Sequence, residues 1–370
     1  MVRVLNVISS LELGGGVQQL LLNYFKHMNR NQIQFDYIVH GNKIGGLEKE
    51  VKKLGSNVYH VSPKKESFFK NIKEINKVIK EGNYDVVHCH QDLSNFSSLF
   101  LAKVNLVPVR ISHAHSNFTT KSRLRNIRNS IMRILNKKFA NSFFACSLDS
   151  GRWLHGEQWK PNGNNVLLKN AIDIERFSFN EQLRIEYRRQ LGIVDKTVLL
   201  HVGRFSKEKN HMFMLEILEK VLMKDKNYIL MFVGSGDIEN EVKNAAKTRK
   251  ISDHIMFLGA RKDVPELMHA SDVHLLPSKH EGFGMTAIEA QVSGLFTLVS
   301  DKVPLDTRIS ELIKYLPINT ASPWNEEIIN IKLGRRHSQA NAAEKSGYSI
   351  SSQAYNYEKW IFNAVAKNRK

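Results

Sequence analysis

Residues 272–289 read DVHLLPSKHEGFGMTAIE. An apolar run of the length of a buried strand opens this stretch, and residues that favour a helix close it. The glycines between them, Gly282 and Gly284, allow a sharp turn and a close approach of the backbone to a ligand. A strand that leads through such a turn into a helix is the unit from which parallel sheets are built. Two acids, Glu281 and Glu289, stand on either side of the turn.

The same unit recurs in two sets, one before residue 150 and one after residue 190. Apolar runs predict strands at 2–9, 35–40, 84–90, 107–115 and 142–147 in the first set, and at 197–203, 228–234, 254–259, 272–278 and 295–300 in the second. Strands that are apolar throughout and alternate with helices are typical of parallel sheets covered on both faces. The sequence therefore predicts an α/β protein with two doubly wound, Rossmann-like domains.

A chain of 370 residues has room for two such domains. We place the first at residues 1–172 and the second at 173–350, and we expect the amphipathic segment 351–370 to form a helix that returns to the first domain. Ligands of open α/β sheets bind beyond the carboxyl ends of the strands. We therefore expect the two domains to face each other across a cleft, with the functional groups on the loops after the strands.

The charge of the chain is strongly basic and unevenly distributed. The formal net charge is +18, and residues 1–172 hold 25 Lys and Arg against 11 Asp and Glu. An anionic membrane surface, a polyphosphate or a nucleic acid would suit such a first half. We see no signal peptide and no apolar run of the ~18 residues that span a bilayer. Cys89 and Cys146 lack metal-ligand spacing, and we expect two buried thiols in a cytoplasmic protein that is soluble or peripherally attached.

A basic amphipathic helix is predicted near residues 121–138. Residues 116–148 hold seven Lys and Arg and no acid, and five apolar residues follow helical spacing: Leu124, Ile127, Ile131, Ile134 and Leu135. Such a helix is typical of membrane-surface binding. A helix that packs its apolar face on the core and leaves its basic face in water is the alternative, and the sequence does not decide between them.

The first domain offers two candidate sites. A glycine run, which includes Gly15 and Gly16, follows the first strand and lacks the G-x-G-x-x-G pattern of a dinucleotide site. It would either admit a ligand closely or serve only as a tight turn. His113 and His115 follow a later strand, and the strand before it carries a second H-x-H pair, His88 and His90. Such pairs can bind a metal, but no further ligand is evident nearby. We expect one histidine of the later pair to face the cleft and the earlier pair to be structural.

The second domain carries the stronger signals. Arg204 and Lys209 lie on the loop after its first strand, where two fixed cations suit a diphosphate, although a solvated basic loop is the plain alternative. Glu281 lies in the glycine loop, and Glu289 lies on the next helix, where a carboxylate can accept two hydrogen bonds from a vicinal diol. The amino end of that helix suits a phosphate or sugar oxygen.

These motifs together resemble glycosyltransferase family 4, the retaining enzymes of GT-B fold. The family's E-x7-E pattern matches Glu281 and Glu289, and its G-R-F-x-x-x-K-N pattern matches residues 203–210. NAID at 170–173 and the glycine loop are also similar to the family. RISHAHS and GGGVQ look most like the branch that builds bacterial capsular polysaccharide and exopolysaccharide.

The resemblance implies a role for each matching residue of the second domain. Glu289 would hold the ribose hydroxyls of a nucleotide sugar. Glu281 would contact the donor sugar beside Gly282 and the backbone N–H groups of Phe283 and Gly284. Arg204 and Lys209 would neutralise the diphosphate leaving group.

In the first domain, the resemblance implies that His115 or His113 lines the sugar site as a catalytic residue. The other catalytic residues that it implies, Glu281, Arg204 and Lys209, belong to the second domain. Gly15 and Gly16 would admit the phosphate or the acceptor.

The function implied is the transfer of a hexose or N-acetylhexosamine from a nucleotide diphosphate sugar, with UDP favoured by the resemblance alone, to a lipid-linked glycan. We expect no cofactor and no divalent metal, because the sequence contains no D-x-D motif. Peripheral attachment to the inner face of the cytoplasmic membrane through residues 121–138 is also expected, and binding to nucleic acid is not. A sugar-nucleotide epimerase of the same fold and a basic, non-catalytic protein that binds nucleic acid or membrane are the alternatives.

Overall fold

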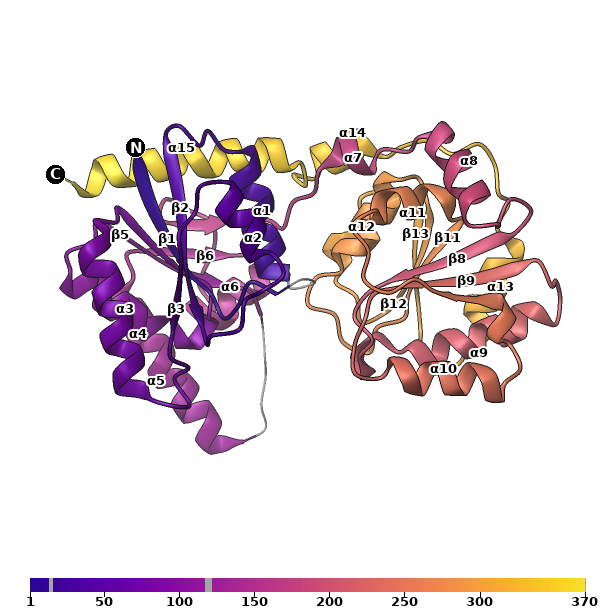
Figure 1. The fold of residues 1–370 in the computed structure, drawn as a ribbon, viewed down its shortest axis with the longest axis horizontal. Helices are drawn as coiled ribbons and strands as arrows, with labels where there is room; N and C mark the ends of the chain where they lie inside the picture. Colours follow the sequence, from indigo (N-terminus) through magenta and orange to yellow (C-terminus); the bar gives the residue numbers. More distant parts are fainter. Residues whose placement is uncertain (13–15, 117–121, 370) are drawn as a thin grey trace. The chain divides into compact units, whose positions relative to one another are not determined.

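The computed structural model describes residues 1–12, 16–116 and 122–369. The chain forms two compact units (Figure 1): Met1–Ala171 together with Ser349–Lys370, and Ile172–Tyr348. The boundaries expected from the sequence follow residues 172 and 350. Each unit is built on its own parallel sheet with helices on both faces. The predicted doubly wound α/β class is confirmed.

The first unit contains a seven-stranded sheet in the order β3-β2-β1-β4-β5-β6-β7. Neighbouring strands are parallel throughout. The strand order reverses between β1 and β4, which is where ligands bind in open α/β sheets. The bounds are β1 Val2–Val7, β2 Ile33–His40, β3 Val58–Val61, β4 Val86–Cys89, β5 Val109–Ala114, β6 Ser142–Ala145 and β7 Asn165–Leu167.

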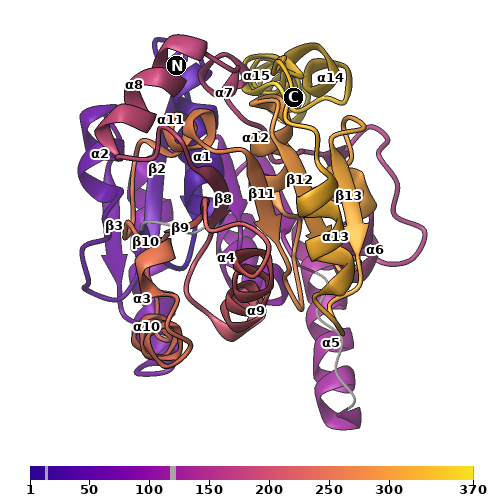
Figure 2. The same ribbon diagram turned by 90° about the vertical axis from the view of Figure 1, so that its right-hand side faces the viewer.

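Helices cover both faces of this sheet. α1 and α15 contribute to the core on one face, and α3 and α4 to the core on the other. The beginning of α5 extends beyond the rest of the first unit (Figure 2). No helix of the described residues is long and apolar enough to cross a membrane. The bounds are α1 Gly16–His27, α2 Glu48–Lys53, α3 Phe68–Gly82, α4 Asn95–Val104, α5 Arg123–Phe139, α6 Leu148–His155 and α15 Ile350–Asn368, with a 3-10 turn, η1, at Asp92–Ser94.

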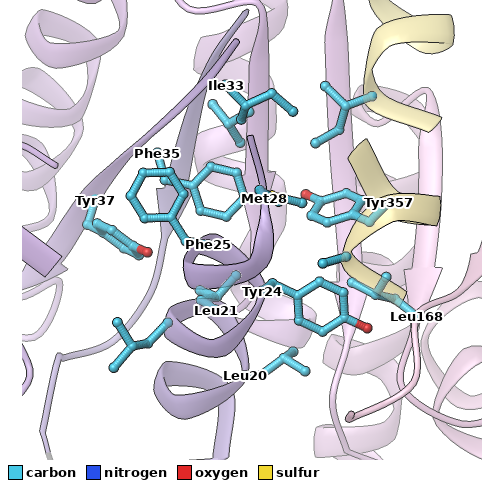
Figure 3. Close-up of a cluster of buried hydrophobic side chains, with 14 of the residues drawn as sticks. Leu20, Leu21, Tyr24, Phe25, Met28, Ile33, Phe35, Tyr37, Leu168 and Tyr357 are labelled. Carbon is cyan, nitrogen blue, oxygen red and sulfur yellow. The ribbon is translucent and has the colours of Figure 1, made fainter. Parts of the chain in front are cut away.

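The carboxyl-terminal helix α15 completes the core of the first unit. Its buried residue Tyr357 lies with its ring 5.9 Å from that of Tyr24 on α1 and 6.4 Å from that of Phe35 on β2, both edge to face. Figure 3 shows these aromatic rings meeting between the helices and the sheet. Edge-to-face packing of this kind adds to the large apolar area that aromatic side chains bury.

The second unit contains a six-stranded parallel sheet in the order β10-β9-β8-β11-β12-β13, which reverses between β8 and β11. Its strands are β8 Thr197–Val202, β9 Tyr228–Val233, β10 Ile255–Phe257, β11 Val273–Leu276, β12 Phe296–Ser300 and β13 Ile313–Leu316. Its helices are α7 Ile174–Phe177, α8 Glu181–Gln190, α9 His211–Leu222, α10 Glu239–Thr248, α11 Val264–Ala270, α12 Met285–Val292, α13 Ser322–Asn330 and α14 Ala340–Lys345, with 3-10 turns η2 Lys207–Lys209, η3 Ser252–His254 and η4 Leu305–Thr307.

Three strands were not predicted: β3, β7 and β13. Each lies at the edge of its sheet and is only partly buried. An edge strand has a neighbour on one side only, so it does not need the continuous apolar run by which a central parallel strand is recognised.

Candidate active site

Lys209 and Glu281 are in contact beyond the carboxyl edge of the second sheet. β8 and β11 are parallel neighbours, so the loops that follow them leave the sheet on the same side. Nζ of Lys209 lies 2.5 Å from Oε2 of Glu281, and the hydroxyl of Ser278 donates to the same oxygen at 3.0 Å. The other carboxylate oxygen, Oε1, takes part in neither bond. Two residues predicted for one site, 72 positions apart in sequence, are thus brought together.

Arg204 lies on the same loop as Lys209 but bonds elsewhere. Its guanidinium lies 3.1 Å from Oδ2 of Asp237, and both side chains are exposed, at 68% and 86%. An exposed ion pair of this kind contributes little to stability. The guanidinium can therefore exchange Asp237 for another anion at small cost.

The glycine loop is shaped by Gly284 and anchored by Phe283. Gly284 precedes α12 with φ of 90°, in the left-handed region that favours glycine, and a Cβ there would lie 3.2 Å from Cγ1 of Val303. Phe283 is buried, with its ring 5.9 Å from that of Tyr348. At Gly282 a Cβ would meet no protein atom within 4 Å. The space beside Gly282 is therefore open to a ligand, while Gly284 serves the turn itself.

Glu289 lies in the second turn of α12, partly buried and without a hydrogen-bond partner for its carboxylate among the described residues. Burial raises its pKa to about 7, and the charge of Arg176 opposes this rise. A carboxylate in such a place gains stability from any ligand that donates hydrogen bonds to it.

The histidines of the two H-x-H motifs form two hydrogen-bonded pairs on one face of the first sheet. Nε2 of His88 lies 3.0 Å from Nδ1 of His113, and Nδ1 of His90 lies 2.9 Å from Nε2 of His115. The rings of His88 and His90 lie 3.9 Å apart, centroid to centroid, and those of His113 and His115 lie 4.0 Å apart. Burial lowers the pKa of all four, that of His115 to about 3, so the cluster is neutral at physiological pH.

Burial separates the two members of the pair that the sequence could not distinguish. His113 is wholly buried, whereas His115 is partly exposed. The backbone N–H of His115 donates to Oδ1 of Asp92 at 2.7 Å, and the hydroxyl of Ser116 donates to Oδ2 of the same acid at 2.6 Å. Of the two candidates, only His115 can touch a ligand without rearrangement of the core.

Binding of a metal ion is the other function that such a histidine cluster could have. One nitrogen from each of His88, His90 and His113 can be chosen so that all lie within 4.8 Å of one another, and imidazole suits Zn²⁺. Among the described residues, however, both nitrogens of His88 and of His90 have hydrogen-bond partners, and of these three rings only Nε2 of His113 is buried without one. Three ligands would require several of these bonds to break, so hydrogen bonding explains the cluster better.

The glycine run is only partly described. Gly15 lies outside the described residues. Gly16 is the first residue of α1, and a Cβ there would meet nothing within 4 Å. The start of α1 is therefore open beside Gly16, beyond the end of β1.

Comparison with known proteins identifies the family. Residues 14–176 match the model of "Glycosyltransferase Family 4", and residues 184–312 match that of "Glycosyl transferases group 1". The chain belongs to glycosyltransferase family 4. It is therefore an enzyme that transfers a sugar, of the hexosyltransferase class.

Curated relatives match the glycosyltransferase over most of its length. It is 29% identical to the "Putative glycosyltransferase EpsF" of Bacillus subtilis (strain 168), over 88% of this chain and 86% of that one. It is 24% identical to the "Capsular polysaccharide biosynthesis glycosyltransferase CapH" of Staphylococcus aureus, over 85% of each chain. The "UDP-Gal:alpha-D-GlcNAc-diphosphoundecaprenol alpha-1,3-galactosyltransferase" of Escherichia coli is 26% identical over 63% of this chain and 62% of its own.

Solved structures share the fold of the glycosyltransferase. Anabaena Alr3699/HepE, determined in complex with UDP-glucose, superposes with a TM-score of 0.72 at 17% identity, over 100% of this chain and 98% of that one. The predicted GT-B class is confirmed by this likeness together with the two doubly wound units.

Four residues that contact the candidate site were missed in the sequence. Ser278 hydrogen-bonds Glu281, and Asp237 pairs with Arg204. Asp92 accepts from the backbone of His115, and Asn6 hydrogen-bonds the ring of His90. Ser278 and Asp237 show no signal in a loop rich in polar residues. Asn6 does show one, because it interrupts the otherwise apolar strand VRVLNV, and a polar residue in a buried strand needs a partner.

Proposed function

We propose that this glycosyltransferase moves a hexosyl or N-acetylhexosaminyl group, with retention, from a UDP-sugar to a lipid-linked glycan in the synthesis of a bacterial surface polysaccharide. The observation that carries the proposal is the edge of the second sheet, where Lys209 pairs with Glu281 and the carboxylate of Glu289 lacks a partner among the described residues. Relatives and structural neighbours support the donor, the pathway and the acceptor: HepE was determined with UDP-glucose, CapH belongs to capsular polysaccharide biosynthesis, and the Escherichia coli enzyme acts on a diphosphoundecaprenol-linked sugar.

The donor is held by charge and by hydrogen bonds to its hydroxyl groups. Glu289 accepts from the ribose hydroxyls, and Oε1 of Glu281 accepts from a hydroxyl of the sugar. The diphosphate meets Lys209, Arg204 and the backbone N–H groups of the glycine loop at the start of α12. These groups stabilise the negative charge that develops on the departing phosphate, which is the main electrostatic demand of the reaction.

The transfer step needs no covalent intermediate with the enzyme. The bond between the anomeric carbon and the β-phosphate oxygen breaks, and the bond from the acceptor oxygen to that carbon forms on the same face of the sugar. The proton of the acceptor hydroxyl passes to the departing phosphate, so the products are a glycoside and UDP. Glu281 is paired with Lys209 and serves in binding, unlike the nucleophilic carboxylate of a retaining hydrolase.

Of the two histidines, His115 is the candidate for contact with the sugar, because the side chain of His113 is wholly buried. Gly15 and Gly16 remain candidates for close contact with the phosphate or the acceptor.

Peripheral attachment to an anionic membrane through α5 would bring the enzyme to a lipid-linked acceptor. α5 buries polar residues and exposes apolar ones. Its buried residues are Asn129 and Asn136. Four apolar residues form an exposed stripe: Leu124 (80% exposed), Ile127 (52%), Ile131 (53%) and Ile134 (64%). The alternative of a helix packed on the core by its apolar face is thus wrong. α5 carries six Lys and Arg and no acid, so an anionic lipid surface suits both its charge and its apolar stripe.

Calorimetry of nucleotide binding is the direct test of the donor site. We would measure binding of UDP, GDP and ADP, with EDTA present, to the wild type and to Glu289→Ala. The variant Glu186→Ala, on α8, is the matched control for loss of one glutamate. We expect UDP to bind to the wild type and to the control, and affinity in Glu289→Ala to fall by at least about tenfold, the value of one hydrogen bond to a charged group.

Absence of binding by all three nucleotides would overturn the proposal. Tighter binding of GDP or ADP would correct the donor class and leave the transferase. If a UDP-sugar were isomerised with no acceptor present, the epimerase alternative would replace transfer.

A further inference from the structure

Only one of the two histidine pairs reaches the surface of the first unit. The deeper pair, His88 and His113, ends on the hydroxyl of Tyr357, which lies 2.7 Å from Nδ1 of His88. The shallower pair, His90 and His115, ends on Asn6 of β1, whose Oδ1 lies 3.3 Å from Nε2 of His90. His115 is the partly exposed end of this second chain of bonds.

The position of each hydrogen in the shallower pair follows from the contact between His90 and Asn6. The amide of Asn6 is oriented with Oδ1 towards Nε2 of His90 and with its own Nδ2 buried and without a partner among the described residues. In this orientation Nε2 of His90 carries the hydrogen, because an amide oxygen can only accept. His90 is neutral, because burial lowers its pKa well below the ordinary value, and its Nδ1 is therefore a lone pair. That lone pair accepts from Nε2–H of His115 at 2.9 Å. His115, also neutral, is left with a lone pair on its own Nδ1.

The backbone around His115 is held as firmly as its ring. Its N–H donates to Asp92 at 2.7 Å, and its carbonyl oxygen lies 3.6 Å from Sγ of Cys146. Nδ1 of His115 has no hydrogen-bond partner among the described residues. It is not one of the buried atoms without a partner, so it is accessible to solvent. A fixed lone pair is thus presented at the surface of the unit, at the carboxyl edge of its sheet.

We propose that Asn6 and His90 are positioning residues, which hold His115 in its Nε2–H tautomer so that Nδ1 accepts a hydrogen bond from a hydroxyl group of the bound sugar. The inference rests on the proposed function and assigns a polarity to its sugar site.

The polarity matters to the chemistry. A sugar hydroxyl that donates its hydrogen keeps its oxygen rich in electrons and stabilises the positive charge that develops on the sugar in the transition state. An Nδ1–H group in the same place would draw electrons from that oxygen and oppose the charge. The tautomer is therefore expected to affect kcat more than KM.

The tautomer can be read directly in the wild type. Protein labelled with ¹⁵N in its histidines gives two-bond ¹H–¹⁵N correlations that distinguish Nδ1–H from Nε2–H, and the spectrum of His115→Ala assigns the signals. We expect the Nε2–H form for both His90 and His115. An Nδ1–H or doubly protonated His115 at neutral pH would overturn the inference.

Three variants separate positioning from packing. His90→Phe keeps a ring but removes the acceptor, His90→Asn places an amide oxygen near the position of Nδ1, and His88→Phe makes the same change in the deeper pair as a control. Turnover is measured as UDP release from UDP-glucose and UDP-galactose, with water as the acceptor, at a temperature where all variants are folded by circular dichroism.

We expect His90→Phe to lower kcat by about tenfold to a hundredfold with KM for the donor little changed, since it removes one hydrogen bond and leaves a donor unpaired. His90→Asn should recover most of the loss, and His88→Phe should lower the melting temperature without a comparable loss in kcat. Equal losses in all three variants, or an unchanged kcat in His90→Phe, would overturn the inference. Failure of UDP to bind would instead remove the proposed function, while the tautomer spectrum would stand as measured.

Discussion

Lys209 and Glu281 form an ion pair in which each side chain determines where the other lies. With Nζ 2.5 Å from Oε2, the acid holds the cation at the edge of the sheet but also competes with a diphosphate for it. Glu281→Gln keeps the shape of the side chain and removes the charge. We expect this variant to bind UDP about threefold to tenfold more tightly, because a negative charge near the diphosphate is lost, and to release UDP from a UDP-sugar at least about tenfold more slowly, because the contact to the sugar weakens.

Calorimetry with UDP and a steady-state assay with the UDP-sugar would separate the two effects. Lys209→Met is the opposite control, since it removes the cation and should weaken UDP binding. If Glu281→Gln weakened UDP binding as Lys209→Met does, the acid would be needed to orient the cation and would not compete for it.

Glu289 should make nucleotide binding depend on pH near neutrality. Its pKa is raised to about 7, so the carboxylate is mostly ionised at pH 8 and mostly protonated at pH 6. A protonated carboxyl group loses acceptor strength toward the ribose hydroxyls, and affinity for UDP should fall by up to about tenfold over this interval. In Glu289→Gln this contribution should vanish, while the titration of UDP itself affects both proteins alike. Equal pH profiles for the two proteins would mean that Glu289 does not meet the nucleotide.

The candidate residues of the second unit were recognisable in the sequence because they stand in motifs with fixed spacing, after strands whose order places their loops together. The roles of the histidines were not, because His113 and His115 differ only in burial, and two residues on the same face of a strand look alike in sequence.

α5 is an element whose environment the sequence left open. An apolar stripe at helical spacing suits either a core or a membrane surface, and in the structure this stripe is exposed while the buried side carries Asn129 and Asn136. The amide of Asn136 donates to the carbonyl oxygens of Asp92 and Leu93 at 3.3 Å, so polar contacts hold α5 to the unit.

The apolar stripe should therefore be needed for membrane binding and not for folding. The double variant Ile127→Ser/Ile131→Ser should lose most sedimentation with vesicles that contain phosphatidylglycerol, at low salt, while its melting temperature changes little. Ile185→Ser, an exposed apolar residue of α8, is the control and should sediment as the wild type does. Wild type that stays in solution with such vesicles would contradict attachment through α5, and loss of sedimentation in the control would show that the effect is not specific to the helix.

At the scale of the whole molecule, the chain leaves the first unit at Ala171 and returns to it at Ser349. Tyr357 of α15 is buried against Tyr24 and Phe35, whereas Tyr355 on the same helix is 65% exposed. We expect Tyr357→Ala to destabilise the first unit by about 3–5 kcal/mol, the cost of emptying an aromatic site in a core. Scanning calorimetry should show one transition lowered, and UDP should still raise the other, because the donor residues belong to the second unit.

Tyr355→Ala should leave both transitions in place. If Tyr357→Ala abolished UDP binding at a temperature where the second unit remains folded, the donor site would depend on the first unit, contrary to this expectation.

The sequence by itself determined the two doubly wound units, the loops that hold the candidate site residues and the family. Apolar runs, glycine turns and motif spacing are local patterns, so they can be recognised without knowing the fold. Only the tertiary structure decided which histidine reaches the surface, that Lys209 pairs with Glu281, that Arg204 turns to Asp237, and that the apolar side of α5 is exposed. Burial and pairing depend on what other parts of the chain place beside a residue, and no local pattern carries that information.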